Sequence, residues 1–304
     1  MSTSLNIAAY GQGILYPPNL QKHTSTIQNA GWDTLLIGLF HISVSGEIGF
    51  NNDQIISKEK GYFGNANWAP QLTKLLTGGD VKTLIASFGG GGVGDFNNVK
   101  NIYNNNNQSF SGTNLESNFK TFKKAFPMIG VIDMDCEDKY DQSSFVSFCQ
   151  MLIEIGFELT FCPYSYSEMG FWTGSLAALE KSNPGKVLRW NLQCYDGGGS
   201  NNPKDWAAAI KKAIPTFKTD GFIWAGDWSR NYDKIISQWV GNCPPALQAH
   251  LTNFKGEPSI GGTFLWTIDQ IEEYAHEQTI HKDPSPCGTI TQVEYVQAMK
   301  NAFS

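Results

Sequence analysis

The stretch that decides the fold is Val131-Ile132-Asp133-Met134-Asp135-Cys136-Glu137-Asp138. Successive side chains of a β-strand point to opposite faces, so its apolar and acidic residues separate when the stretch is extended. The apolar face holds Ile132, Met134 and Cys136. The acidic face holds Asp133, Asp135 and Glu137. A strand that packs an apolar face on a helix and ends an acidic face in a wet cavity is typical of the C-terminal mouth of a parallel barrel.

The rest of the chain alternates strands with helices. Apolar, β-branched or aromatic runs bounded by Gly, Asn, Asp and Pro predict strands at about residues 5–11, 34–43, 82–88, 129–136, 158–164, 187–195, 221–226 and 261–267. Apolar residues at helical spacing lie between them, as in Asn67–Leu76, Asn114–Ala125, Ser143–Ile155 and Pro203–Ile214. Eight such units favour a (β/α)8 TIM barrel over an open doubly wound sheet, which has about six strands. We expect residues 1–304 to form one catalytic barrel domain without a large insertion domain.

The composition limits the kinds of partner. The 304 residues are 41% hydrophobic and 13% aromatic, which supplies a large core and a surplus for a binding cleft. Only 16% of them are charged and the net charge is -6, which argues against nucleic acid or an anionic membrane surface. We find no run long enough to cross a membrane and no secretory signal at Met1–Asn6, so localisation stays open. We expect a neutral ligand and a monomeric protein.

The six cysteines show no CxxC spacing and no Cys/His cluster, so we expect no structural zinc site. Four of them fall in predicted strands or a predicted helix, which indicates buried thiols: Cys136, Cys149, Cys162 and Cys194. Cys243 and Cys287 lie in later loops and could pair, which the sequence leaves open. There is no HExxH pair and no GxSxG run, so neither metal hydrolysis nor Ser-His-Asp acyl transfer is indicated.

The acidic face fits a calcium loop or a solvated loop less well than a functional site. A calcium loop that starts at Asp133 needs Gly at its sixth position and Glu at its twelfth, where the chain has Asp138 and Ser144. Acids in a solvated loop would leave the apolar alternation unexplained. Carboxyls two residues apart on one strand face lie about 6–7 Å apart, close enough for their titrations to couple. We therefore expect a shared proton, with Glu137 as the donor and Asp135 turning between its neighbours.

A glycine-rich run, Ser87–Gly94, follows the third predicted strand. It contains a GxGxxG pattern, but Asp95–Asn98 predict no obvious helix and no acid follows at the end of the next strand, so a dinucleotide site is not favoured. Glycine also lets a backbone approach a ligand or a neighbouring strand closely. The polar tract Asn101–Ser111 is expected to be a solvated surface loop.

Aromatic residues gather at the predicted strand ends: Tyr10, Phe40, Tyr164, Tyr195, Trp224, Trp228 and Trp266. In a barrel some of these belong to the core, and Trp224 is the best candidate. The others suggest a cleft with stacking platforms for the apolar faces of sugar rings.

With these motifs, the chain resembles the glycoside hydrolase family 18 chitinases, in particular the compact hevamine-like type. The resemblance runs from Ala9–Gln12 to Gly261–Trp266, which is similar to the GGxxxW run of that type. The family's DxxDxDxE signature is similar to residues 130–137, its SxGG motif to Ser87–Gly90, and the QxYN run to Gln193–Asp196. The departures lie within the signature and remove no reacting group: Gly130, Val131 and Cys136.

The resemblance implies a retaining mechanism in which the substrate's own 2-acetamido group attacks the anomeric carbon and forms an oxazolinium ion. It implies that Glu137 is the acid, that Asp135 orients the acetamide, and that Asp133 shares a proton with Asp135. Tyr195 is implied to hydrogen-bond the acetamido oxygen. The implied substrate-binding residues are Tyr10, Gln12, Phe40, Gly89, Gly90, Tyr164, Gln193, Asp196 and Trp266, the last as the floor of the site. The resemblance also implies cis peptide bonds at Leu39–Phe40 and Trp266–Thr267, and it implies no metal or organic cofactor.

Three functions follow from this resemblance. The leading one is an endo-acting chitinase that cleaves β-1,4-linked N-acetylglucosamine polymers, with chitin or an N-acetylglucosamine-containing oligosaccharide as the partner. An endo-β-N-acetylglucosaminidase that acts on N-glycans would use the same chemistry. A non-catalytic sugar-binding protein is the third, although such relatives usually lose the acid that this chain keeps at Glu137.

Overall fold

Eight parallel strands close into a barrel in the computed structural model, which describes residues 5–273, 287 and 290–304. The ring runs β1-β2-β6-β7-β8-β9-β10-β13 and closes where Asn6 of β1 pairs with Gly262 of β13. The strands are β1 (Asn6–Gly11), β2 (Thr34–Ile42), β6 (Thr83–Gly89), β7 (Val131–Asp135), β8 (Glu158–Phe161), β9 (Val187–Gln193), β10 (Ile223–Trp228) and β13 (Ile260–Trp266). The (β/α)8 prediction is confirmed, because each predicted strand corresponds to one strand of this ring.

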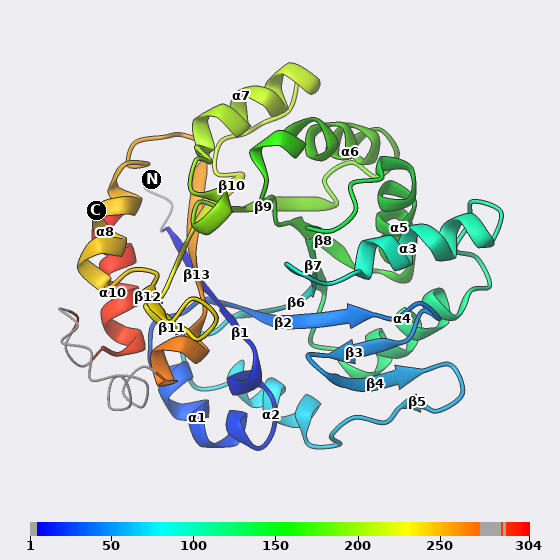
Figure 1. Ribbon diagram of the computed structural model, residues 1–304, viewed down its shortest axis with the longest axis horizontal. Helices are drawn as coiled ribbons and strands as arrows, with labels where there is room; N and C mark the ends of the chain where they lie inside the picture. The colour runs from blue at the N-terminus through cyan, green and yellow to red at the C-terminus, as the bar shows by residue number, and fades with distance from the viewer. Residues whose placement is uncertain (1–4, 274–286, 288–289) are drawn as a thin grey trace.

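Helices surround the ring of strands, as Figure 1 shows. They are α1 (Asn19–Gln28), α2 (Trp68–Leu75), α3 (Asp95–Asn105), α4 (Asn114–Ala125), α5 (Gln142–Ile155), α6 (Met169–Ser182), α7 (Pro203–Ala213), α8 (Pro244–Thr252) and α10 (Gln292–Phe303). The four helices that the sequence predicts are present within two residues at each end.

Helix α3 corrects two expectations. It begins at Asp95, where no helix was expected, and it includes the first five residues of the tract expected to be a loop, Asn101–Ser111. The Asn-rich sequence hides its apolar face, on which Phe96, Val99 and Tyr103 are buried. Its first turn is stabilised from outside, because the Asp138 carboxylate accepts hydrogen bonds from the backbone N–H groups of Phe96 and Asn97.

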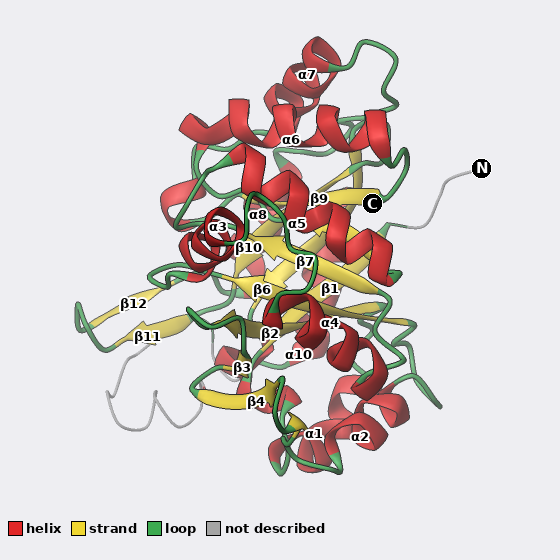
Figure 2. Cartoon of the chain, turned by 90° about the vertical axis from the view of Figure 1, so that its right-hand side faces the viewer, coloured by secondary structure: helices red, strands yellow, loops and turns green. Residues whose placement is uncertain are grey.

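In the described part of the chain, five short strands lie outside the ring of eight. Strands β3 (Ile48–Phe50), β4 (Asp53–Ser57) and β5 (Gly61–Tyr62) extend β2 in antiparallel fashion. Strands β11 (Asn231–Asp233) and β12 (Gln238–Val240) form a hairpin that projects from the body of the molecule (Figure 2). The segment between β10 and β13 holds this hairpin and α8, in agreement with the expected lack of a large insertion domain.

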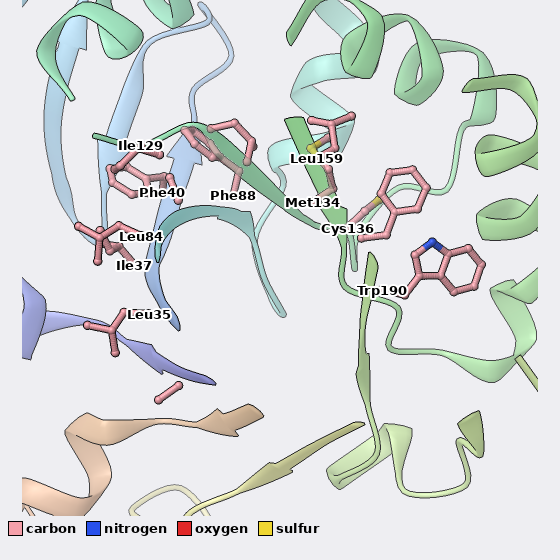
Figure 3. Packing of buried hydrophobic residues seen from close by; sticks show 14 of the residues in the cluster. Leu35, Ile37, Phe40, Leu84, Phe88, Ile129, Met134, Cys136, Leu159 and Trp190 are labelled. Carbon is pink, nitrogen blue, oxygen red and sulfur yellow. The ribbon is translucent and has the colours of Figure 1, made fainter. Parts of the chain in front are cut away.

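Two apolar clusters pack the barrel, one on each side of the strands. The outer cluster lies between strands and helices and includes the whole apolar face of β7 with Cys136, as Figure 3 shows for Met134 and Cys136. The inner cluster fills the barrel with residues such as Tyr10, Tyr195 and Phe264. Trp224 belongs to it and is 5% exposed, so its assignment to the core is confirmed. The alternation read from the sequence therefore places the acids of β7 inside the barrel.

The remaining expectations concern cysteines and backbone. Cys243 and Cys287 are joined by a disulfide, and the other four cysteines are buried free thiols. Within the described ranges, no helix has the length and apolar character needed to span a membrane. The peptide bond Trp266–Thr267 is cis as expected, whereas the other expected cis bond lies one residue earlier, at Gly38–Leu39.

Candidate active site

A cavity of about 380 Å³ opens at the C-terminal ends of the barrel strands. Its lining combines three carboxyls with aromatic and amide side chains. Among the predicted site residues, it takes in Tyr10, Gln12, Gly90, Asp135, Glu137, Tyr164, Gln193, Tyr195, Asp196 and Trp266. The structure therefore brings together at one mouth residues that the sequence spreads over more than 250 positions.

Asp133 lies beneath this cavity and is fully buried. Its Oδ2 accepts hydrogen bonds from the Tyr10 and Ser87 hydroxyls, each at 2.8 Å. Its Oδ1 accepts from the Thr160 hydroxyl at 2.6 Å and from the Asn191 amide at 2.8 Å. Burial raises the pKa of Asp133, and these hydrogen bonds oppose the rise. Because all four partners can donate, the site is built for an ionised carboxylate.

Four different strands supply these donors. They come from β1, β6, β8 and β9, while the carboxylate comes from β7. Burial and the Asp133 charge raise the pKa of the Tyr10 hydroxyl well above its ordinary value, so that hydroxyl keeps its proton and donates. Inward-facing polar side chains from these strands thus surround one buried carboxylate.

Asp135 and Glu137 form the layer above. The Gln193 amide donates to Asp135 Oδ1 at 3.2 Å and to Glu137 Oε1 at 2.9 Å. The two carboxyls also hydrogen-bond to each other. Burial, then the charges of Glu137 and Asp133, raise the pKa of Asp135 well above its usual range, and burial also raises the pKa of Glu137. Both carboxyls of this layer therefore bind a proton more readily than an exposed carboxyl does, and both face the cavity.

The glycine-rich run brings the loop after β6 against β7. Gly90 N donates to the backbone carbonyl of Asp135 at 2.8 Å, and a Cβ on Gly89 would collide with that same carbonyl. Gly89 has φ +114°, which favours glycine. Gly90 and Gly91 line the cavity, whereas Gly89 packs against the backbone of β7 and does not line it. At this position glycine serves the close approach of one backbone to another.

Phe40 is the second predicted binding residue that lies elsewhere. It is fully buried outside the barrel, with ring centroids 5.1 Å from Phe88 and 5.0 Å from Phe50 (Figure 3 labels Phe40 and Phe88). The pairing register between β2 and β6 shifts between Ile37 and Phe40, which breaks the alternation of side chains. As a result Leu39 lines the cavity and Phe40 faces the helices.

Aromatic rings line the cavity. Trp266 lies beside Tyr10 with ring centroids 5.3 Å apart, and Tyr195 stacks on Trp228 at 6.1 Å. Across the mouth, the Tyr164 hydroxyl donates to Asp196 at 3.4 Å. Such surfaces suit the apolar faces of sugar rings.

Four lining residues were missing from the predicted site: Leu39, Gly91, Cys162 and Trp228. Trp228 could have been predicted from the sequence, because it is one of the aromatic residues at the predicted strand ends. Cys162 follows a strand like many core thiols, and its contact with the Gln193 amide, 3.5 Å away, arises only from the closed ring.

A second cavity, of about 490 Å³, shares Gln12 with the first. Its lining is polar and rich in amides, from Asn51, Asn52, Asn231 and Gln270 among others. In the part of the chain that the structure describes, no three His, Cys, Asp or Glu side chains are placed to hold a metal ion.

No protein-family model and no curated protein matches the chain in sequence. Solved structures do match in fold. The crystal structure of a GH18 chitinase from Pseudoalteromonas aurantia has a TM-score of 0.61 at 14% identity, covering 91% of this chain and 99% of that one. The catalytic domain of a hyperthermophilic chitinase from Pyrococcus furiosus has a TM-score of 0.61 at 13% identity, covering 99% and 96%.

A third match is the spore cortex-lytic enzyme SleL of Bacillus cereus, with a TM-score of 0.58 at 12% identity, covering all of this chain and 75% of that one. At these identities the matches show a shared barrel fold over nearly the whole chain.

Proposed function

We propose that the protein is an endo-acting glycoside hydrolase that cleaves β-1,4-linked N-acetylglucosamine polymers, as chitinases do. The observation that carries the proposal is the layered set of carboxyls, with Asp133 beneath Asp135 and Glu137 and with Trp266 in the lining of the same cavity. The fold shared with GH18 chitinases supports the same assignment.

Glu137 is the proposed general acid. Its carboxyl faces the cavity, and burial raises its pKa, which favours the protonated form that an acid needs. It protonates the glycosidic oxygen as the bond from that oxygen to the anomeric carbon breaks. The carboxylate left behind then takes a proton from the water that attacks the anomeric carbon, which returns Glu137 to its starting state.

Asp135 is poorly suited to be the nucleophile. A nucleophilic carboxylate must be ionised, but burial and two neighbouring carboxyls raise the pKa of Asp135 well above its usual range. We assign the attack to the substrate's 2-acetamido oxygen, which bonds to the anomeric carbon and gives an oxazolinium ion. Asp135 accepts a hydrogen bond from the acetamide N–H and holds that group in place for the attack.

The remaining residues orient the sugar. Tyr195 donates to the acetamido oxygen, Gln193 fixes the two outer carboxyls, and Trp266 packs under the reacting ring. The second polar cavity, joined to the first at Gln12, offers hydroxyl-binding amides to neighbouring sugars, which favours a polymeric substrate cut within the chain.

Product analysis on defined oligomers of N-acetylglucosamine tests the proposal. The wild type should release shorter oligomers with the β configuration retained, and Glu137→Gln should lower turnover by about 10²–10⁴-fold. Oligomer binding by Glu137→Gln, measured by calorimetry, should persist because the amide keeps the shape of the site. A wild type that binds oligomers without releasing products would instead indicate a sugar-binding protein, and cleavage of a glycoprotein alone would indicate an N-glycan hydrolase.

A further inference from the structure

A row of three polar side chains runs along the inside of β9, and only two of them take part in the site above. Gln193 holds the outer carboxyls and Asn191 donates to Asp133. The third is Arg189, which lies deeper in the barrel. The chain contains 20 lysines but only two arginines, Arg189 and Arg230. An arginine inside the barrel is therefore unusual for this sequence.

The contacts that Arg189 makes with the described residues leave its charge without a direct counter-ion. Its guanidinium carbon lies 3.5 Å from the centroid of the Trp224 ring, and its Nε donates to Asn191 Oδ1 at 3.2 Å. Its Nη2 is buried and has no hydrogen-bond partner in that part of the chain. Flat stacking on an indole and a fixed donor geometry are properties of arginine that lysine lacks.

Asn191 connects this cation to the buried carboxylate. Its amide oxygen faces the guanidinium, and its amide nitrogen donates to Asp133 at 2.8 Å and to the Thr160 hydroxyl at 3.3 Å. The reverse orientation would place the amide oxygen against a carboxylate and the amide N–H group against a cation. Arg189 therefore determines which way the amide points, and it polarises the bond that Asn191 gives to Asp133.

We propose that Arg189 is a positioning residue for hydrolysis, a half-buried cation that orients Asn191 and stabilises the negative charge on Asp133. The inference rests on the proposed function, because it assigns Arg189 a part in setting the protonation of the same three carboxyls.

The groups around Arg189 determine how its loss would act. The ionisable side chains whose charges act on it are Tyr10 of β1, Asp33 just before β2 and Asp133 of β7, while β10 contributes the neutral Trp224. Burial lowers the pKa of Arg189 to about 10, and Asp133 opposes this, so the guanidinium stays charged across the working range of a carboxyl site. Removing a cation destabilises neighbouring anions. Asp133, Asp135 and Glu137 would then bind protons more tightly.

The test compares the pH profile of kcat/KM for four variants. Arg189→Met and Arg189→Gln remove the charge, and the Gln variant keeps an N–H donor of its own. Both should move the acid and basic limbs to higher pH by about one unit, which lowers kcat/KM about tenfold at a fixed pH on the acid limb. Arg189→Lys keeps the charge and should leave the limbs near their wild-type positions. Lys186→Met is the matched control, because it removes a cation from a 44% exposed side chain that pairs with Glu158.

The proposal is wrong if the limbs stay in place in both neutral variants, or if they move equally in Arg189→Lys. A uniform loss of kcat at every pH would indicate a structural role and would also overturn it. Should Arg189→Met fail to fold, the Gln and Lys variants decide alone.

A second readout does not depend on turnover. Infrared titration of the protonated carboxyl band in the substrate-free protein should show the same upward movement in the two neutral variants. If the wild type hydrolyses nothing, the proposed function fails, and this titration still decides the role of Arg189.

Discussion

The inner and outer carboxyl layers of the site are held in opposite ways. Asp133 receives four hydrogen bonds from four strands and is closed to the cavity. Two residues later on the same strand, Asp135 shares a single amide group with Glu137, and both face the cavity. The barrel stabilises the inner charge with donors, whereas the outer pair lowers its charge by keeping protons.

This difference separates two tasks. Burial raises the pKa of Asp133, but its four donors oppose this rise and favour the ionised form, so Asp133 is the carboxyl best suited to carry a negative charge. The outer pair has few donors and a raised pKa, so its proton is available for chemistry. The hydrogen bonds of the inner layer should therefore stabilise the folded state, whereas the burial of the two outer carboxyls should destabilise it.

The largest expected effect breaks the inner layer. Asp133→Asn replaces one acceptor oxygen by an N–H group that faces donors, which should lower the free energy of unfolding by about 3 kcal/mol. Asp135→Asn is the matched control on the same strand. It should lower the free energy of unfolding by less than about 1 kcal/mol, because it removes a buried carboxyl that has few hydrogen-bond donors. Urea unfolding of both variants at neutral pH measures the difference. Equal losses would show that the two layers do not differ in the way described.

The sequence predicted the fold well because the fold depends on local alternation. Runs such as Val131–Cys136 show which residues face the helices, and the eight strands follow. Helix α3 was missed because its first turn is stabilised by Asp138, a residue more than 40 positions away in sequence. The sequence of a helix does not show that a carboxylate from another part of the chain will cap it.

The site was predicted less evenly. The positions of Asp133, Asp135 and Glu137 follow from strand periodicity, and the structure places Asp135 and Glu137 in the lining of the cavity and Asp133 beneath it. Phe40 was misplaced because a register shift in β2 turned it outward, and such a shift depends on the neighbouring strand. Arg189 escaped notice because only closure of the ring shows that β9 points it towards Asp133 through Asn191.

A smaller effect is expected in how the free energy of unfolding depends on pH. The folded-state pKa values of Asp135 and Glu137 lie above their unfolded values, so the unfolded chain loses these protons first as pH rises. Their contribution to stability is present below about pH 4 and is lost as pH rises through the folded pKa values. Each proton so held changes the free energy of unfolding by about 1.4 kcal/mol per pH unit.

Asp135→Asn removes one of these groups and should flatten the fall of stability above about pH 4. Urea unfolding from pH 4 upward in wild type and variant measures the two slopes. Asp141→Asn provides a control of opposite sign, because its bond with Lys100 lowers the pKa of Asp141. If the free energy of unfolding of Asp135→Asn fell with pH as steeply as that of the wild type, the outer layer would not hold its proton in the free protein.

The smallest effect tests how redundant the inner layer is. Ser87→Ala removes one of the four donors to Asp133, and the other three continue to stabilise the charge, so the loss of stability should be only about 1 kcal/mol. Ser175 of α6 is an apt control, since it is equally buried and its hydroxyl has no hydrogen-bond partner among the described residues. Ser175→Ala should be neutral or stabilising, because it deletes a buried polar group that gains nothing from folding. If thermal and urea unfolding gave the same small change for both serines, the bond to Asp133 would carry no charge stabilisation. A loss as large as that of Asp133→Asn would instead mean that the four donors act as one cooperative unit.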